Sequence, residues 1–377
     1  MSLRHAHRRL ACLALLMAAV VASAGCDGKP ESEAREVWRF AIEESKGSVQ
    51  HQYAMRFKQL IEERTDGEVE VVVYPYGTLG TSTQITEQLA LGVVEFAMAS
   101  PGSLGKFIPQ LQVFLLHFVL PQQPDDVRAV LSDPQLVRSL DPLYAEKGLA
   151  LLSMYSEGQM AWTLKEEVRT PADFSGLKMR VMTSPILLAA YGAYGASPTP
   201  MPYSEVYSGL QLNMIDGQVN PVFAIERQKF HEVTNWLIFP GHSAFVTTAA
   251  ANRAFLETLP ASQRALVRSV IAELDPWIFE IQTELESQRL VVILKDSLRQ
   301  RRPLHLVGNT DGLLASFTAD QRRELVEENP YLTLEPPLTP AEVAAFREAS
   351  KQVQQVFLDI GGNDADAILT RVLSSSS

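Results

Sequence analysis

The 377-residue sequence is poor in several residue types that particular classes of protein require. It contains 2 cysteines, too few for a disulfide framework. Its 33 Lys and Arg residues are outnumbered by 44 Asp and Glu residues, which gives a formal net charge of −11. Such a negative balance argues against nucleic acid as a partner and against adsorption to anionic lipid.

Motifs for catalysis and for metal binding are missing as well. The stretch GHSAF (241–245) begins like a nucleophile elbow, but Phe245 stands where the tight turn needs glycine. GAYGAS (192–197) lacks the third glycine and the preceding strand of a dinucleotide loop, and there is no phosphate loop. The histidines after residue 25 have no metal-ligand spacing and are predicted to be surface or hydrogen-bonded residues: His51, His117, His231, His242 and His305. We therefore expect neither an enzyme nor a cofactor or metal site.

The first 25 residues differ from the rest of the chain. Three arginines precede a short apolar run over residues 10–22, and small residues follow, a pattern typical of a secretory signal peptide. Residues 23–26 resemble a lipobox, which predicts an acylated Cys26; ordinary cleavage after Ala24 is the alternative. Asp27 resembles the signal that keeps bacterial lipoproteins on the inner membrane, and residues 26–35 suit a polar tether.

Without the leader the chain keeps 30 basic residues against 44 acidic ones, a net charge of about −14. From residue 36 on, strand-like and amphipathic helical patterns alternate, as in a parallel sheet covered on both faces. A second α/β set begins near Gly158, residues 261–300 predict one extended helix spanning both sets, and residues 197–202 are expected to form a crossing segment. Thr339 and Glu342 predict a capping box at the start of a late helix.

Arg180 is the most unusual residue of the second set. In GLKMRVM (176–182) apolar and polar residues alternate, with Met179 and Val181 on one side of a predicted strand and Arg180 on the other. A guanidinium among bulky apolar neighbours is costly to desolvate unless an anion meets it. The anion could be a permanent Asp or Glu partner or a ligand.

Four segments together resemble the DctP-type substrate-binding proteins of TRAP (tripartite ATP-independent periplasmic) transporters. The resemblance is in residues 74–97, GLKMRV (176–181), YGASPTPMPYSEVYSGLQLNMIDGQVNP (194–221) and QKFHEVTNWL (228–237). It implies the type II periplasmic-binding-protein-like fold, with two α/β domains joined by crossing strands and a long helix. The expected domains are 36–157 plus 246–285 and 158–245 plus 286–377, with the ligand in the cleft between them.

The resemblance also implies roles for single residues. Arg180 would hold the carboxylate of the ligand in a bidentate pair, and the amide of Asn220 would reach the same carboxylate. Gln218 would shape the loop around Asn220, and Tyr203 would form an aromatic wall. Further residues are expected to line the cleft: Thr183, Ser100 and Glu43.

One departure from the family bears on the ligand. Many relatives place a second arginine where this chain has Met160, and the nearby Gln159 and Trp162 do not restore the charge. Acidic sugars and dicarboxylates are therefore less expected. Glu43, with apolar or cation-stacking surface from Trp162, Tyr203 and Phe223, suits a zwitterion such as an amino acid or a solute of the ectoine kind. An apolar monocarboxylate, with Glu43 turned to solvent, is the alternative. Residues 309–337 look longer than usual and have no assigned role.

The resulting hypothesis is a periplasm-facing lipoprotein of a Gram-negative bacterium. It would capture a small carboxylate-bearing solute and deliver it to the small and large TRAP membrane subunits for uptake driven by a cation gradient. A ligand sensor that presents a small acid to a membrane receptor kinase is the second hypothesis. A lyase or hydrolase on the same scaffold is the third, and it would need a nucleophile or metal site that the sequence does not show.

Overall fold

The computed structural model describes residues 35–375, apart from the side chains of residues 310 and 311. The predicted signal peptide, Cys26 and nearly all of the tether lie outside the described residues. Within them, no helix combines the length and the apolar character that crossing a membrane demands.

All the strands join through hydrogen bonds into one 11-stranded sheet. They are β1 (Glu36–Ala41), β2 (Val69–Tyr74), β3 (Phe96–Ala99), β4 (Leu149–Leu164), β5 (Lys178–Val181), β6 (Ser197–Pro200), β7 (Gly217–Pro221), β8 (Trp236–Ile238), β9 (Ala244–Asn252), β10 (Leu304–Val307) and β11 (Leu332–Glu335). Residues 197–202, expected to cross between the two sets, instead begin with β6, which pairs in parallel with β5. Its prolines suit such an edge strand, because proline cannot donate a ladder hydrogen bond.

Strand β4 joins two halves of this sheet. Its first part, up to Gln159, pairs antiparallel with β9, and β9 pairs in turn with β3, β1 and β2. Its last part, from Met160, pairs with β7 and β8, which lead to β5 and β6 on one side and to β10 and β11 on the other. A bulge between Ser156 and Gln159 separates the parts. Gly158 stands there at φ +121°, a conformation that a residue with a side chain rarely adopts.

The helices are α2 (Val49–Arg64), α3 (Ser82–Ala90), α4 (Pro101–Leu104), α5 (Pro124–Leu131), α6 (Pro134–Ala145), α7 (Pro185–Ala193), α8 (Val206–Gln211), α9 (Val222–Arg227), α10 (Arg253–Thr258), α11 (Ala261–Gln300), α12 (Thr310–Leu313), α13 (Ala319–Arg322), α14 (Pro340–Gly361) and α15 (Ala365–Ser375). Short 3₁₀ turns include η1 (Pro109–Leu115), η2 (Pro171–Phe174), η3 (Tyr203–Glu205), η4 (Phe230–Glu232) and η6 (Gly362–Asp364); η5 (Arg323–Glu327) is a π turn. The predicted capping box of Thr339 and Glu342 opens α14.

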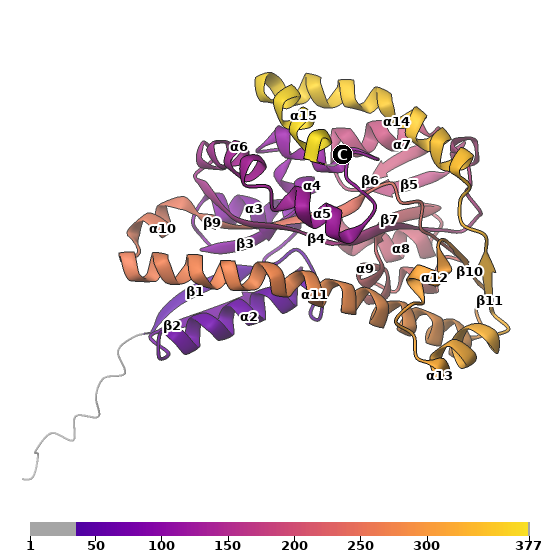
Figure 1. The fold of residues 1–377 in the computed structure, drawn as a ribbon, viewed down its shortest axis with the longest axis horizontal. Coiled ribbons are helices and arrows are strands. Elements are labelled where there is room, and N and C mark those ends of the chain that lie inside the picture. Colours follow the sequence, from indigo (N-terminus) through magenta and orange to yellow (C-terminus); the bar gives the residue numbers. More distant parts are fainter. Residues whose placement is uncertain (1–34, 376–377) are drawn as a thin grey trace, which may run out of the picture. The chain divides into compact units, whose positions relative to one another are not determined.

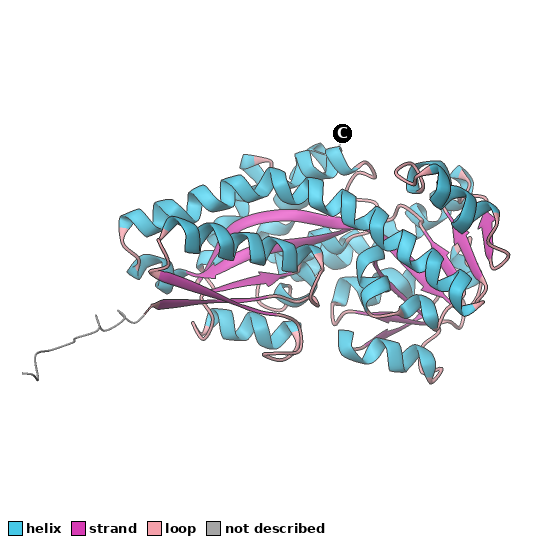
Figure 2. Ribbon diagram, turned by 90° about the horizontal axis from the view of Figure 1, so that it is seen from below, coloured by secondary structure: helices cyan, strands magenta, loops and turns pink. Residues whose placement is uncertain are grey.

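The long helix α11 has the bounds that the sequence predicted, residues 261–300. It runs beneath the sheet (Figures 1 and 2), where it contacts α2 beside the first half and α9 beside the second half. The prediction of two α/β halves joined by crossing strands and a long helix is therefore confirmed in β4, β9 and α11. Because these elements cross, the residues from Val37 onward group as one compact unit, and the predicted domain boundaries stay a prediction.

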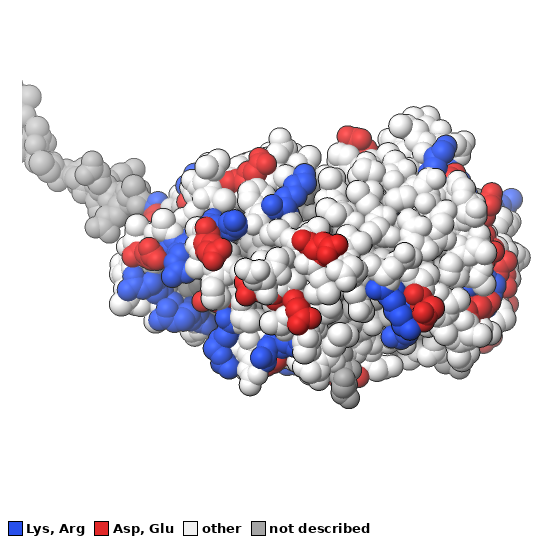
Figure 3. Space-filling model, turned by 90° about the horizontal axis from the view of Figure 1, so that it is seen from above, with Lys and Arg blue, Asp and Glu red and all other residues white. Residues whose placement is uncertain are grey.

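Two apolar clusters fill the two faces of the sheet. One contains Trp162 of β4 and side chains from α3, α5, α6, α7, α14 and α15; the other contains Ala161 and side chains from α2, α8, α9 and α11. Successive residues of a strand point to opposite faces, so neighbouring positions of β4 enter different clusters. On the face of the molecule drawn in Figure 3, basic side chains gather at the left end with acidic side chains among them, and charged side chains are sparser over the rest.

Candidate ligand-binding site

A cavity of about 120 Å³ lies where segments from both halves of the sheet meet. The first half contributes the loop after β1, the start of α3 and helix α4; the second half contributes the ends of β5 and β7 and the segment after β6. Its lining includes Glu43, Glu44, Tyr76, Thr81, Ser100, Ser103, Arg180, Thr183, Met201, Tyr203, Asn220 and Phe245. A smaller cavity of about 20 Å³ adjoins it and shares Arg180 and Asn220.

Arg180 is the buried cation of this cavity. It lies on β5 between β6 and β7, with Met179 and Val181 packed into the core on the opposite face, as the alternation predicted. Arg180 is 3% exposed, and burial lowers its pKa to about 10. Its Nε and Nη2 atoms donate to the Met201 carbonyl at 3.0 and 2.8 Å. Among the described residues, no carboxylate forms an ion pair with it.

Asn220 stands beside Arg180 at the end of β7. It lines both cavities, and its Nδ2 donates to the Oε1 atom of Gln218. Gln218 is fully buried and donates to the Thr163 hydroxyl at 2.8 Å, so it holds the orientation of the Asn220 amide from behind. The cavity wall on this side therefore offers a guanidinium and an oriented amide.

Glu44 provides a carboxyl group on the opposite wall. It is 4% exposed and accepts a hydrogen bond from the Tyr203 hydroxyl at 3.2 Å. Burial raises its pKa to about 8, with a smaller contribution from the neighbouring Glu43. The Tyr203 ring packs edge-on against Tyr76, with ring centroids 5.5 Å apart. The tyrosines and Glu44 thus form a wall that can receive a cationic group.

Glu43 is held more tightly than its neighbour. Its Oε2 atom accepts from the Ser100 amide at 2.8 Å, and its Oε1 atom accepts from the Ser103 hydroxyl. Burial raises its pKa above the ordinary value. These bonds fix the loop after β1 to the start of α4, so that Glu43 and Ser100 line the cavity while their polar groups bind one another.

A third buried carboxyl group lies behind this wall. Glu157, on the β4 bulge, accepts from Gln50 Nε2 at 2.8 Å, and Gln50 also accepts from the Glu43 amide at 2.8 Å. Burial raises the pKa of Glu157 well above its ordinary value. Within residues 35–375, its second oxygen has no hydrogen-bond partner. Two buried carboxyl groups therefore line the cavity together with one buried guanidinium, and a third buried carboxyl group lies behind the cavity wall.

The structure distributes the predicted site residues unevenly. It brings to the main cavity Arg180, Asn220, Tyr203, Thr183, Glu43 and Ser100. Met160 lines the small adjoining cavity. Gln159 bonds the Gln122 carbonyl and faces a different cavity. The remaining three, Gln218, Trp162 and Phe223, are buried in packing and line neither cavity. Trp162, expected to add surface around the ligand, instead donates to the Tyr191 hydroxyl within the core.

Sequence reasoning missed Glu44, Tyr76 and Glu157. Glu43 and Glu44 follow β1 after a single residue, Ile42. A loop that brings one of these glutamates to the cavity brings its neighbour close as well, and this adjacency was the available signal. Two larger cavities, of about 270 and 480 Å³, exist elsewhere. We place the site in the smaller one because it joins a buried guanidinium to buried carboxyl groups, whereas the arginine of the 270 Å³ cavity, Arg128, is exposed.

Comparison with known proteins agrees with this geometry. Residues 40–302 match the model of the DctP family, described as bacterial extracellular solute-binding protein, family 7. The ectoine/5-hydroxyectoine-binding periplasmic protein UehA of Ruegeria pomeroyi is 34% identical over 338 residues, 89% of each chain. The ectoine-binding periplasmic protein TeaA of Halomonas elongata is 34% identical over 88% of this chain and 87% of its own length.

Solved structures show the same relationship. The ectoine-binding protein of the TeaABC TRAP transporter matches with a TM-score of 0.78 over 90% of this chain and 99% of that one, at 32% identity. A TRAP solute-binding protein of Marinobacter aquaeolei, in an apo open structure, matches with a TM-score of 0.75 over 89% and 99%, at 37% identity. The chain therefore belongs to family 7 of the bacterial extracellular solute-binding proteins, the DctP-type substrate-binding proteins of TRAP transporters.

Proposed function

We propose that this protein binds a small zwitterion with one carboxylate and one compact cation, and delivers it to the membrane subunits of a TRAP transporter. The main support for this proposal is the polarity of the cavity, with Arg180 and Asn220 on one wall and Glu44 on the other. A carboxylate placed at Arg180 would meet the one group in the cavity that is buried, cationic and without an internal carboxylate partner.

The acidic wall argues against a ligand that carries only negative charge. Glu43 and Glu44 line the cavity and Glu157 lies behind it, so a dicarboxylate would add charge to a site that already holds more acids than cations. A zwitterion adds no net charge and supplies the cation that this wall lacks. UehA and TeaA, which are named for binding ectoine, support a ligand of this class.

The size of the cavity points the same way. A volume of about 120 Å³ holds roughly ten water-sized atoms, on the scale of about 10–15 Å³ for one water-sized probe. That is the size of a small amino acid or a compact cyclic compatible solute. A larger acidic sugar would need the two halves of the molecule to stand farther apart.

The alternative ligand, an apolar monocarboxylate, required Glu43 to turn to solvent. Glu43 instead is buried and bonded to Ser100 and Ser103. A monocarboxylate would give the Glu44 carboxyl group on the opposite wall no cation to bind, whereas a zwitterion supplies one, and this favours the zwitterion.

A matched pair of ligands tests whether the site requires a cationic group on the ligand. Pipecolate and cyclohexanecarboxylate share a six-membered ring and a carboxylate and differ in the ring nitrogen. We expect pipecolate-like zwitterions and ectoine to raise the thermal midpoint by mass action, with cyclohexanecarboxylate weaker and succinate without effect. Stabilisation by dicarboxylates alone would contradict the proposal.

Delivery and attachment are the remaining parts of the proposal. Proteoliposomes with the small and large membrane subunits should take up the ligand only when this protein and a cation gradient are both present. Cys26→Ser should move the protein from the membrane fraction to the soluble periplasm without changing its affinity, because Cys26 is not among the residues that line the cavity. A wild-type protein that is soluble and carries no acyl mass would contradict the lipid anchor.

A further inference from the structure

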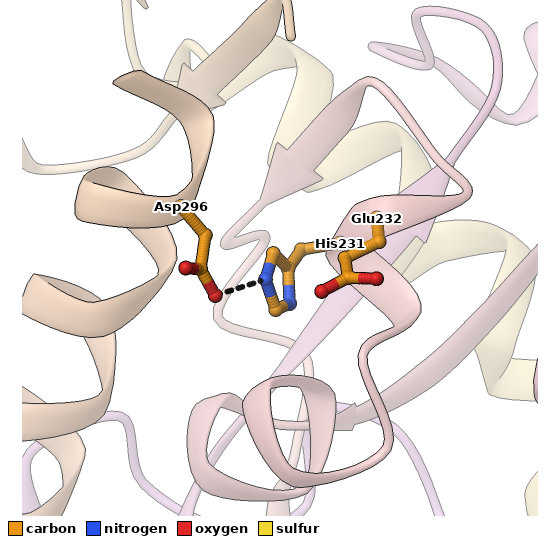
Figure 4. A group of neighbouring side chains, drawn as sticks. All are labelled: His231, Glu232 and Asp296. Carbon is orange, nitrogen blue, oxygen red and sulfur yellow. Dashed lines mark hydrogen bonds and ion pairs between the residues drawn. The ribbon is translucent and has the colours of Figure 1, made fainter. Parts of the chain in front are cut away.

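A second group of polar side chains lies outside the ligand cavity. His231 and Glu232 come from η4 and Asp296 comes from α11, and their side chains converge (Figure 4). Their ligand-type atoms all lie within 4.8 Å of one another, and the His231 side chain is 4% exposed. A small cavity of about 10 Å³ is lined by these three residues together with neighbours from the end of α11.

The hydrogen bonding of the imidazole ring is unbalanced. Nδ1 of His231 faces the Ile225 carbonyl at 3.4 Å, and Nε2 faces the Asp296 carboxylate at 3.3 Å. Both neighbours are acceptors. In a neutral imidazole one nitrogen carries the proton, so the other directs its lone pair at an acceptor. When Nδ1 donates to the carbonyl, the lone pair of Nε2 is directed at the carboxylate, so a cation placed between the two would be bound by both; a proton on Nε2 can take the same place.

We propose that this group binds Zn²⁺ or a similar divalent transition metal, with His231 Nε2, Asp296 and Glu232 as protein ligands and water in the fourth position. The donor set of one imidazole and two carboxylates suits zinc, whereas magnesium and calcium prefer oxygen alone. Two ligands at about 2.0–2.1 Å from a tetrahedral zinc stand about 3.3 Å apart. The distance from His231 Nε2 to Asp296 Oδ2 is 3.3 Å.

The surroundings fit a ligand role for each residue. The Ile225 carbonyl accepts from Nδ1, the usual outer partner that orients a metal-binding histidine. The cavity has room for about one water-sized sphere. The three ligand atoms lie up to 4.8 Å apart, so a carboxylate would have to move inward by roughly 1.5 Å to reach the separation of about 3.3 Å between two zinc ligands.

Side chains of the protein already donate to the two carboxylates from their outer sides. Lys229 and Gln300 donate to Glu232 at 3.1 Å each, and Arg299 donates to Asp296 Oδ1 at 2.8 Å. Lys229 and Arg299 are largely exposed, at 64% and 75% of their side chains, so they can swing away at little cost. Asp296 keeps its other oxygen, Oδ2, directed at the imidazole.

A metal here would fasten the last turns of α11 to η4 within the second half of the sheet. The group shares no residue with the ligand cavity. Zinc should therefore stabilise the fold without changing the affinity for the solute, so this proposal can fail independently of the proposed function.

The test uses full-length folded protein freed of metal with a chelator. Free Zn²⁺ at 100 times its Kd is expected to raise the thermal midpoint by about 3–4 °C, and Mg²⁺ is expected to have no effect. Co²⁺ should show the intense visible bands of tetrahedral coordination. Both responses should disappear in His231→Gln and in Asp296→Asn, which provides a second variant if one of them fails to fold.

His305 offers a matched control. It forms a similar contact with a carboxylate, Nδ1 to Glu335 Oε1 at 2.9 Å, but it belongs to no such group of three among the described residues. His305→Gln should keep the zinc and cobalt responses. The proposal is overturned if wild type gives neither response, or if His231→Gln responds to zinc as wild type does.

Discussion

Two arginines only eleven positions apart meet opposite environments. Arg169 lies near the surface and donates to both oxygens of Glu342, at 2.8 and 3.0 Å, and also to the carbonyls of Pro336 and Pro337. Those hydrogen bonds lower the pKa of Glu342 to about 2. Arg180 is buried and bonds a single carbonyl oxygen, that of Met201.

The difference separates a structural ion pair from a charge kept for a ligand. Arg169 has its counter-ion within the chain, so its charge is satisfied whenever the protein is folded. Arg180 bears the cost of burial, visible in its lowered pKa, without a carboxylate to offset it. A buried cation at a cavity wall is therefore the stronger indication of function, and the paired arginine is the natural control for it.

The largest expected effect is on binding. Arg180→Ala should weaken ligand affinity by about 2–5 kcal/mol, because truncation leaves the carboxylate of the ligand buried without its partner. Arg180→Lys should recover part of the loss, since the planar fork is absent. Arg169→Ala should leave affinity unchanged. If calorimetry finds equal ligand affinity in Arg180→Ala and wild type, Arg180 is not kept for the ligand and does not differ from Arg169 in this respect.

The second largest effect is expected at Glu44, on the acidic wall of the cavity. Glu44→Gln should weaken zwitterion binding by about 1.5–3 kcal/mol, the usual value of a hydrogen bond to a charged group, and leave cyclohexanecarboxylate binding little changed. The matched variant is Glu43→Gln, which breaks the bonds to Ser100 and Ser103 and should lower stability more than it changes ligand preference. Equal losses for both ligands in Glu44→Gln would show that the residue does not meet a cation.

The third effect is the pH dependence of affinity. A cation at Glu44 requires the ionised carboxylate, whose pKa in the free protein is about 8. Affinity should therefore rise roughly tenfold, or about 1.4 kcal/mol, for each pH unit well below 8 and level off above it. Binding at pH 7 should release close to one proton, measurable by calorimetry in buffers of different ionisation enthalpy. Glu44→Gln should abolish both signals.

The stability of the ligand-free protein should change in the opposite direction with pH. The pKa of Glu44 is raised on folding, so its contribution is fully present below the unfolded value of about 4.5 and is lost as the pH rises through about 8. Urea titrations of wild type and Glu44→Gln between pH 5 and 8 would measure this. A wild-type stability that rises across this range relative to the variant would contradict the raised pKa.

The smallest effect is expected at the surface pair. Arg169→Ala should lower the free energy of unfolding by about 1 kcal/mol or less, since the pair is partly exposed and screened by salt. A double-mutant cycle with Glu342→Gln separates this coupling from the role of Glu342 in the capping box of α14. A coupling of several kcal/mol would mean that the surface pair behaves like a buried one.

The sequence predicted elements with a clear period better than side chains in loops. Periodicity located α11 and the buried face of β5 because packing requires it. Glu44 was missed because residues 42–48 form a loop, where no alternation tells which of two adjacent glutamates faces the cavity. Trp162 was expected near the ligand, but its place on β4 directs it into the core with Phe174 and Phe346.

Contacts between distant segments could not be read from spacing. His231 meets Asp296, 65 residues later, because η4 packs against the end of α11. Likewise, the residue pattern of 197–202 does not show whether this segment crosses between the two halves of the sheet or forms an edge strand, as it does in β6. The signal peptide, the lipid anchor and the domain boundaries stay predictions.

The path of β4 and β9 also determines the order in which the protein can fold. In the first half of the sheet, β9 lies between β3 and β4, with Ala251 opposite Phe96. That half therefore lacks a central strand until residue 252 has emerged, by which time strands β5 to β8 of the second half have been made. Such distant pairing slows folding, because the intervening chain must be ordered before the contacts form. A chain released before residue 252 would expose the unpaired edges of β3 and β4, so nascent fragments ending between β4 and β9 should depend most on chaperones.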